Sequence, residues 1–297
     1  MKKIIFVTGS HRSGSTWIGK IISSANRVRY VHEPFNMRQK RNNSPFKYWF
    51  EYVSKKSDKD YQERVRVYLK SFYSTSLNSF SSSLLNSRNT REVYHFFKGI
   101  KGRLSDRTLI KDPIAIMSMD WLEANLNCDV IITVRHPAAF IASLKVKSWE
   151  FDFNNFLDQP ELMDSLLNEF SDDISSFSKN KPDMIMQGIL LWNTIYSTVL
   201  KYKEAHDKDW CFVLHEDLSR EPLREFQKIF NYLNLYFDDR VQKEIIASTA
   251  SSESTKLKRD SKANISSWKK RLSAQEISLI KKETQSIWSK FYSDSDW

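Results

Sequence analysis

The chain has 297 residues, of which 40% are hydrophobic and 13% aromatic, enough for one sizeable core, so a disordered or fibrous protein is excluded. Its formal net charge of +10 indicates an anionic partner, whether a small ligand, a nucleic acid or an acidic surface. No apolar stretch approaches the roughly 18 residues of a membrane span, and the opening apolar run is too short for a signal peptide, so we expect a cytoplasmic protein without stable membrane insertion.

Strands and helices are predicted to alternate along the chain. Short β-branched or aromatic runs predict strands at 3–8, 28–31, 108–113, 129–134 and 210–218. Helical spacing of apolar residues predicts helices near 116–126, 138–149, 160–178 and 184–205, and further helices close the chain. This alternation predicts an α/β fold of three α/β/α layers, in which helices cover both faces of a central parallel sheet.

Three stretches differ from this pattern in composition. Residues 44–100 are polar, aromatic and rich in Ser and Asn, and they predict a helical insertion within a single domain over 1–297. Residues 255–271 carry seven Lys/Arg against one Asp, whereas 150–173 carry eight Asp/Glu and no Lys or Arg. Such patches favour a local anion site, although a solvated charged face explains the acidic stretch equally well.

The two cysteines give no sign of a metal centre. Cys128 and Cys211 each lie beside a predicted buried strand. A packing role in a reducing compartment therefore fits better than a disulfide or a metal framework, and we expect no metal site.

Four polar clusters follow directly after predicted strands. They occupy residues 10–16, 32–35, 111–113 and 135–137. Ligands of open parallel sheets bind at the carboxyl ends of the strands. We therefore expect the four clusters to meet at one rim of the sheet.

The first cluster has the layout of a phosphate-binding loop. Small residues between Gly9 and Thr16 can turn successive N–H groups toward an anion, and the helix that begins there adds its positive N-terminal dipole. The spacing of Gly9 and Gly14 matches a Walker A loop, but Ser15 stands where that loop has Lys, and the basic residue is Arg12. The loop thus keeps a phosphate cradle without the triphosphatase signature; an ordinary turn that caps a helix is the alternative.

The stretch "HRSGSTW" resembles the 5′-phosphosulfate loop of sulfotransferases, [K/R]-S-G-[S/T]-[S/T]-W. These enzymes use 3′-phosphoadenosine 5′-phosphosulfate (PAPS) as the sulfuryl donor and release adenosine 3′,5′-bisphosphate (PAP). The resemblance implies that Arg12 neutralises charge on the bridging oxygen and the leaving phosphate, and that Trp17 packs against adenine. The residues that it assigns to the 5′-phosphate are Ser13, Gly14, Ser15 and Thr16. It implies a PAPS-dependent sulfotransferase with a P-loop-type fold that needs no metal.

A second motif, "ITVRHPAAFIASLKVKSW", resembles the 3′-phosphate element of the same family. That resemblance assigns cofactor binding to Arg135 and Ser143. Pro137 can open a helix, and eight residues are just over two helical turns, so Ser143 should face the same side as Arg135. The planar guanidinium of Arg matches phosphate geometry. A strand-end Arg in a surface salt bridge is the alternative.

A third motif lies near the end of the chain. "RDSKANISSWKKRLS" is similar to the family's loop over the 3′-phosphate, R-K-G-x-x-G-D-W-K. Lys262, Trp268 and Lys269 match this pattern, and Arg259 can replace its missing arginine. We therefore expect 251–273 to form a loop that covers the cofactor.

The transfer also needs a general base for the acceptor hydroxyl. A Glu-Pro after the second strand is the usual candidate in the carbohydrate-sulfating and bacterial branches, which the chain resembles here, so Glu33 is the first candidate and His32 the second. The alternative for Glu33 is an ion pair with a nearby Lys or Arg. Lys111 and Asp112 lie on the same rim, where they either orient the acceptor or form a supporting ion pair.

The acceptor is predicted from the same resemblance. Arg12 in the loop and the Glu-Pro after the second strand resemble the glycan and bacterial branches more than the phenol-sulfating branch. We therefore expect a nucleotide donor and a hydroxyl-bearing carbohydrate or glycoconjugate as partners, and no nucleic acid. The alternatives are a phenolic or alcoholic small molecule as acceptor, a P-loop kinase that uses Mg·ATP, and a basic nucleic-acid-binding protein.

Overall fold

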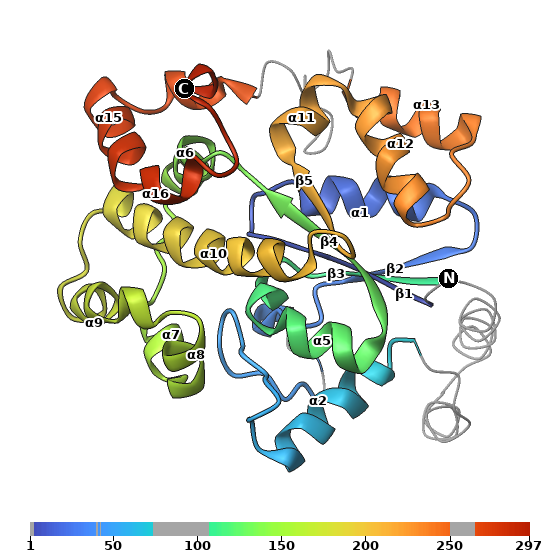
Figure 1. Ribbon diagram of the computed structural model, residues 1–297, viewed down its shortest axis with the longest axis horizontal. Helices are drawn as coiled ribbons and strands as arrows, with labels where there is room; N and C mark the ends of the chain where they lie inside the picture. Colours follow the sequence, from blue (N-terminus) through green and yellow to red (C-terminus); the bar gives the residue numbers. More distant parts are fainter. Residues whose placement is uncertain (1–2, 40, 42, 74–106, 250–264) are drawn as a thin grey trace.

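The protein is built around one parallel sheet, seen in the computed structural model of Figure 1. The structure describes residues 3–39, 41, 43–73, 107–249 and 265–297. Within them, five strands lie in the order β2-β3-β1-β4-β5, and all neighbours are parallel. These strands are β1 (Ile4–Thr8), β2 (Val28–His32), β3 (Arg107–Lys111), β4 (Cys128–Val134) and β5 (Cys211–Leu214).

Helices cover both faces of this sheet (Figure 1). The described α-helices are α1 (Ser15–Ser24), α2 (Lys59–Lys70), α5 (Met119–Leu126), α6 (Pro137–Lys147), α7 (Asn154–Leu157), α8 (Pro160–Ser165), α9 (Ser171–Asn180), α10 (Met184–His206), α11 (His215–Arg220), α12 (Pro222–Tyr232), α13 (Asp239–Thr249), α15 (Ala274–Glu283) and α16 (Gln285–Trp288). The described 3₁₀ turns are η1 (Met37–Gln39), η2 (Pro113–Ser118), η3 (Asn168–Phe170), η4 (Ser267–Lys270) and η5 (Asp294–Asp296).

Alternate side chains of β1 enter two separate hydrophobic cores. Ile5 and Val7 pack with α1, α12 and α13, whereas Ile4 and Phe6 pack with α5, α6 and α10. Successive side chains of a strand point to opposite faces, so β1 is buried on both sides, as the centre of a parallel sheet requires. The predicted three-layer α/β/α fold is confirmed.

The end of β5 corrects one expected boundary. The sequence predicts a strand over 210–218, but the strand ends at Leu214 and α11 begins at His215. Glu216 and Asp217 lie in the first turn of α11, where their negative charge is favourable at a helix N-terminus. The strand prediction is therefore wrong for the second half of this run.

The single helix expected over 160–178 is also wrong, because the chain there forms α8, η3 and α9. The N–H groups of Leu166 and Leu167 both bond to the carbonyl of Leu162, which closes α8. Leu167 is then fully buried, and the chain turns before α9 begins at Ser171.

The helix expected near 116–126 starts earlier than predicted, as the 3₁₀ turn η2 that leads into α5. Pro113 opens η2, and the Asp112 carboxylate accepts the N–H of Ile114 as its cap. These residues follow β3 directly, so the cap fixes the chain at the end of that strand.

The expected insertion over 44–100 is helical only in part. Residues 74–100 lie outside the described residues, and 44–58 form a loop before α2. The Asp58 carboxylate caps α2 by accepting the N–H of Tyr61 at 2.8 Å. Phe50 in this loop is fully buried in the main core, so the loop packs as part of the fold. No helix in the described part of the chain is long and apolar enough to cross a membrane.

Candidate active site

The four polar clusters lie at adjoining strand ends, as the sequence predicts. Strands β2, β3, β1 and β4 are consecutive in the sheet and parallel, so their carboxyl ends form one rim. His32 ends β2, Lys111 ends β3, the loop that starts at Gly9 follows β1, and Arg135 follows β4. Polar residues from four separate parts of the sequence are thereby brought together at one edge of the sheet.

The loop after β1 has a positive φ at three positions, two of which are glycines. Gly9 has φ +143° and Gly14 has φ +91°, both in the region that favours glycine, and Arg12 has φ 67°. A Cβ atom at Gly9 would collide with Thr133, and one at Gly14 would collide with the ring of His215. The two glycines therefore let neighbouring elements approach the loop closely.

The loop leads directly into α1, and no side chain caps the N-terminus of this helix. Gly14 occupies the N-cap position in the left-handed conformation, without a side-chain hydrogen bond to the first turn. The side chain of Ser13 is turned inward, where its hydroxyl donates to the Ser10 carbonyl at 2.5 Å and contacts the Thr133 hydroxyl. Ser15 is buried and Thr16 half-buried in the first turn. The positive end of the α1 dipole is thus available to an anion at the rim.

Arg12 joins the loop to both residues of the second motif. Its Nε donates to the Ser143 hydroxyl of α6 at 2.8 Å, and the guanidinium of Arg135 donates to the Arg12 carbonyl. The structure therefore places Arg135 and Ser143 on the same side, against Arg12. The eight-residue spacing has this effect because Pro137 starts α6 two residues after Arg135.

Helix α10 fixes the backbone of Arg135 from both directions. The Tyr196 hydroxyl accepts the Arg135 N–H at 3.0 Å, and the Trp192 indole donates to the Arg135 carbonyl at 2.9 Å. The two aromatic residues are four apart, so they share one face of the helix. The Tyr196 hydroxyl also lies 2.8 Å from the Ser10 hydroxyl, which connects Arg135 to the phosphate loop. Sequence reasoning missed this clamp.

The side chain of Arg135 fits a phosphate ligand. It is 7% exposed, and its buried Nε has no hydrogen-bond partner among the described residues. Burial lowers the pKa of Arg135, and the negative charge of buried Glu216 opposes that shift. A buried cation with an unused donor is stabilised by an anion that accepts from it. Together with the uncapped α1, Arg135 fits the phosphates of PAPS.

On the other side of the loop, Glu33 forms an ion pair with Lys111. Lys111 is fully buried, and its ammonium donates to one Glu33 oxygen, while Asn36 donates to the other at 2.7 Å. Burial alone would raise the pKa of Glu33, but the charge and hydrogen bond of Lys111, with help from Asn36, hold the pKa below its usual value. The carboxylate is therefore ionised at neutral pH and held at the rim, in the kind of ion pair that the sequence offered as the alternative to a catalytic role.

The other two candidates beside Glu33 differ sharply in environment. His32 is exposed; its pKa is lowered by partial burial and by the charge of Lys111. Asp112 is fully buried and accepts the N–H groups of Phe35 at 2.6 Å and Ile114 at 3.2 Å. Burial raises the pKa of Asp112 to about 7. Of the two residues proposed as a supporting ion pair, Lys111 pairs instead with Glu33, and Asp112 holds the loop after β2.

The remaining predicted cofactor residues are only partly described. The Trp17 indole donates to the Ser248 hydroxyl at 2.8 Å, and its ring packs edge-on against Phe226. Arg259 and Lys262 lie outside the described residues, as does 251–264 of the expected covering loop. In its described part, Trp268 is buried and stacks on His136, with ring centroids 5.2 Å apart. Lys269 instead donates to the Trp297 carbonyl at 2.7 Å.

Two histidines at the rim went unrecognised in the sequence. His215 packs against Gly14, and its place directly after β5 is the signal that could have revealed it. His11 is buried within the phosphate loop, where its ring lies 4.5 Å from Trp149 and 5.1 Å from Phe140. Burial, with the nearby charge of Arg12, lowers the pKa of His11 to about 3. Both side chains shape the loop as neutral rings.

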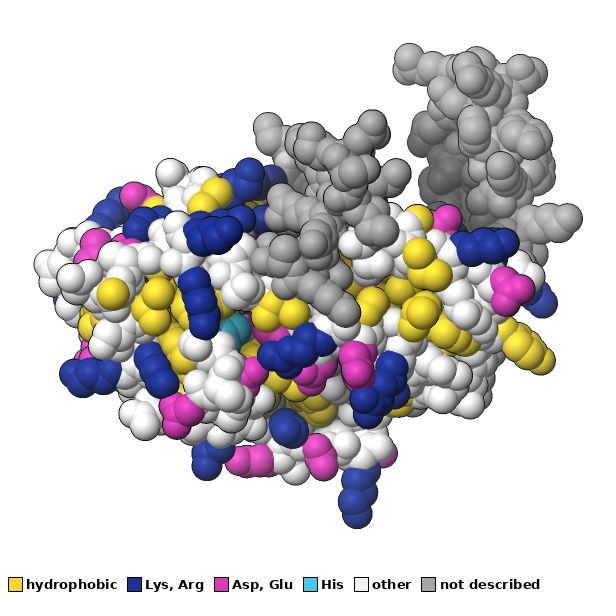
Figure 2. Space-filling model, turned by 90° about the horizontal axis from the view of Figure 1, so that it is seen from above, with side chains coloured by type: hydrophobic (Ala, Val, Ile, Leu, Met, Phe, Trp, Pro, Cys, Tyr) yellow, Lys and Arg dark blue, Asp and Glu magenta, His cyan; other side chains and the backbone are white. Residues whose placement is uncertain are grey.

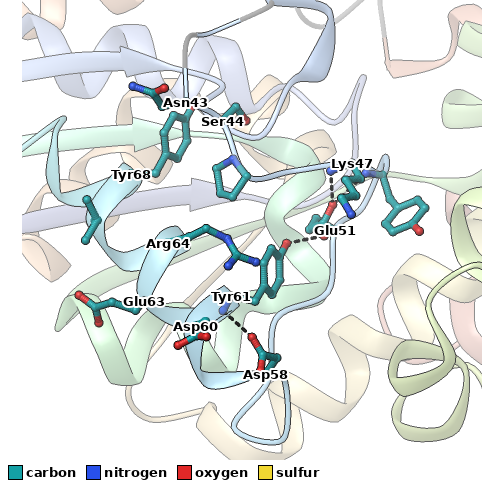
Figure 3. Close-up of a pocket in the computed structure, with 13 residues that line it drawn as sticks. Asn43, Ser44, Lys47, Glu51, Asp58, Asp60, Tyr61, Glu63, Arg64 and Tyr68 are labelled. Atoms are coloured by element: carbon teal, nitrogen blue, oxygen red, sulfur yellow. Dashed lines mark hydrogen bonds between the residues drawn. The ribbon is translucent and has the colours of Figure 1, made fainter.

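A separate cavity of about 1180 Å³ lies between residues 43–51 and α2 (Figure 3). Its carboxylates are partly engaged, since Glu51 accepts from the Tyr61 hydroxyl and from two backbone N–H groups. The lining residue Tyr68 packs edge-on against Phe46, which stacks on Phe35 near Glu33. Buried aromatic rings therefore lie between this cavity and the rim. None of the predicted site residues lines the cavity, so we assign the cavity no part in the chemistry.

Comparisons with known proteins agree with this site. The model of the sulfotransferase family matches residues 5–239, which is well over half of the chain. A sulfotransferase domain of the Synechococcus PCC 7002 olefin synthase has a TM-score of 0.53 at 15% identity, covering 98% of this chain and 96% of that domain. A sulfotransferase domain of the curacin biosynthetic pathway has a TM-score of 0.52 at 13% identity, covering 96% and 98%.

No curated protein matches the sequence significantly. At such low identity, the two solved structures show a shared fold, whereas the family model identifies the family. The phosphate loop, the Arg135 strand end and the three-layer sheet agree with that assignment. The chain belongs to the sulfotransferase family, and the protein is an enzyme that takes the sulfuryl group from PAPS.

Proposed function

We propose that this enzyme sulfates a hydroxyl group of a carbohydrate or glycoconjugate, with Glu33 as the general base. The observation that carries the proposal is the Glu33 carboxylate, ionised and held by Lys111 and Asn36 at the strand end beside the phosphate loop. A carboxylate in this state can accept the proton that the acceptor hydroxyl loses. His32 is the second candidate for this role.

The phosphate side of the site supplies positive charge. When bound, PAPS supplies an activated sulfuryl group, and its transfer leaves negative charge on the departing phosphate of PAP. Arg12 and the N-terminus of α1 stabilise that charge, because they are fixed in place before the reaction begins. Arg135 and Ser143, both in contact with Arg12, hold the 3′-phosphate.

The acceptor side is supported by the residues that follow Glu33. The Glu-Pro pair resembles the carbohydrate-sulfating and bacterial branches of the family. Partly buried aromatic rings of the 44–58 loop, among them Trp49, lie near the phosphate loop through the contact of Phe50 with His11. Flat rings with one exposed face suit sugar rings, which present apolar C–H groups.

The described Lys and Arg side chains do not form one continuous track along the face shown in Figure 2. Lys and Arg side chains of the described residues are interspersed there with Asp, Glu and hydrophobic side chains. A nucleic-acid-binding groove requires a continuous basic surface. This distribution therefore supports local anion sites.

The test measures transfer of ³⁵S from labelled PAPS to matched acceptors. Oligosaccharides, simple phenols and tyrosine peptides are offered separately, and each product is identified by mass spectrometry. We expect label on oligosaccharide hydroxyls. Label on phenols or tyrosine alone would contradict the carbohydrate acceptor and leave the sulfotransferase assignment intact.

A further inference from the structure

We propose that Arg38, Trp49 and Trp149 form an acceptor subsite for a negatively charged sugar, one that carries a carboxylate or a sulfate ester. The proposal rests on the carbohydrate acceptor and specifies its charge. We call these three residues the Arg38 platform.

The geometry of the Arg38 platform leaves the guanidinium available to a ligand. The Arg38 guanidinium carbon lies 5.3 Å from the Trp49 ring centroid and 5.9 Å from that of Trp149. The two rings meet edge-on at 5.7 Å, and both are half-buried, whereas Arg38 is exposed. Among the described residues, its guanidinium makes these ring contacts and no ion pair or hydrogen bond. Ring contacts orient the guanidinium without neutralising it.

The platform is connected to both sides of the reaction site. Toward the predicted base, the backbone N–H of Arg38 donates to the Asn36 side-chain oxygen at 3.0 Å. The Asn36 side-chain amide in turn donates to the Glu33 carboxylate at 2.7 Å. Toward the donor, the Trp149 ring lies 4.5 Å from His11, which precedes Arg12 in the phosphate loop. A sugar that offers a hydroxyl to Glu33 is therefore positioned to contact the platform.

Local charge specifies the sign of the ligand. Residues 34–50 contain four Lys/Arg and no Asp/Glu. Of the carboxylates near the platform in sequence, Glu33 is paired with Lys111, Glu51 accepts from the Tyr61 hydroxyl, and Glu150 is exposed. Two planar donors of a guanidinium match a carboxylate or a sulfate ester, and the Trp rings provide apolar area for the sugar ring.

The experiment compares two tetrasaccharides that share the β-1,4 linkage and differ at C6 of each ring. A β-1,4-linked glucuronic acid tetramer carries a carboxylate on each ring, where cellotetraose carries a neutral hydroxymethyl group. Sulfuryl transfer from ³⁵S-labelled PAPS gives kcat and KM for each. We expect a KM about tenfold lower for the acidic tetramer, the size of one partly exposed charge-assisted interaction, and a smaller difference at high salt.

Substitution then assigns the difference to Arg38. Arg38→Ala should raise the KM of the acidic tetramer about tenfold, with little change for cellotetraose or for PAP binding, and Arg38→Lys should recover part of the loss. Arg224→Ala is the matched control, because Arg224 is an exposed arginine on α12 that pairs with Glu221. Melting temperatures of all variants confirm folding.

The outcomes separate this inference from the carbohydrate assignment. Equal KM values for the two tetramers, or an Arg38→Ala effect that is the same for both, would overturn the subsite while the carbohydrate acceptor stands. Failure of both tetramers to accept label, together with no binding of either to the enzyme–PAP complex by calorimetry, would also overturn it. Label on phenols alone would contradict the carbohydrate acceptor, and the subsite that rests on it would be overturned as well.

Discussion

The substitution Tyr196→Phe removes one buried hydroxyl. It should weaken cofactor binding, although Tyr196 is not one of the residues predicted to contact the cofactor. The hydroxyl accepts the Arg135 N–H at 3.0 Å and lies 2.8 Å from the Ser10 hydroxyl, and Tyr196 is fully buried. Phenylalanine fills the same space but leaves the buried N–H of Arg135 without a partner. An unsatisfied buried group of this kind costs about 1–3 kcal/mol.

Part of this loss of free energy should weaken PAP binding, because the Arg135 backbone positions the side chain that is proposed to hold the 3′-phosphate. We expect the Kd of PAP to rise about tenfold, which corresponds to about 1.4 kcal/mol. The melting temperature should fall by a few degrees for a chain of this size. Isothermal titration calorimetry with PAP needs no acceptor, so the measurement is independent of acceptor identity.

The matched control lies on the same helix. Tyr202 is also buried in α10, and its hydroxyl donates to the Met117 carbonyl at 3.1 Å, away from Arg135. Tyr202→Phe should lower the melting temperature to a similar extent and leave PAP binding unchanged. The reasoning fails if both variants weaken PAP binding equally, or if Tyr196→Phe loses stability while its Kd for PAP stays within twofold.

Four further predictions concern the site and the buried histidines. Glu33→Gln should lower kcat by roughly 10²- to 10⁴-fold with PAP binding unchanged, and a loss within twofold would contradict its role as base. Arg12→Ala should chiefly lower kcat and Arg135→Ala should chiefly weaken PAP binding, because Arg12 alone of the two is proposed to meet charge that moves in the transition state; steady-state kinetics and calorimetry separate the two. Burial holds the pKa of His11, His136 and His215 near 3 in the folded protein, so protons taken up by the unfolded chain below about pH 6.5 should reduce stability as pH falls toward 3. Both ring nitrogens of His136 are buried without a partner in the described structure, so His136→Phe should stabilise the protein and reduce the pH slope from urea unfolding by about 1.4 kcal/mol per pH unit; an unchanged slope would refute this.

Much of the rim could be predicted from the sequence because its residues adjoin strand ends. A strand followed by small or basic residues is a local signal, and it correctly located the phosphate loop, Glu33, Lys111 and Arg135. The spacing of Arg135 and Ser143 was equally local, since Pro137 fixes where the intervening helix begins. Parallel strands then bring these local signals together.

The supporting contacts were beyond such reasoning. Tyr196 meets Ser10 across 186 residues, and it resembles any other apolar-face residue of a long helix until the sheet is assembled. The pairing of Lys111 with Glu33 rather than Asp112 depends on which neighbouring strand end lies closest. Predicted element boundaries were wrong where a single tertiary contact determines the boundary. The burial of Leu167, which separates α8 from α9, is an example.

The central position of β1 bears on how the enzyme is made. This strand is synthesised before both of its neighbours in the sheet, β3 and β4, which end at Lys111 and Val134. At synthesis rates of 5–20 residues per second, the strand waits roughly 5 to 25 s for its partners. During that time its apolar side chains are exposed, which makes the nascent chain a client for chaperones. The phosphate loop is thus synthesised before the later elements that contact it, among them α10, whose Tyr196 hydroxyl lies 2.8 Å from the Ser10 hydroxyl.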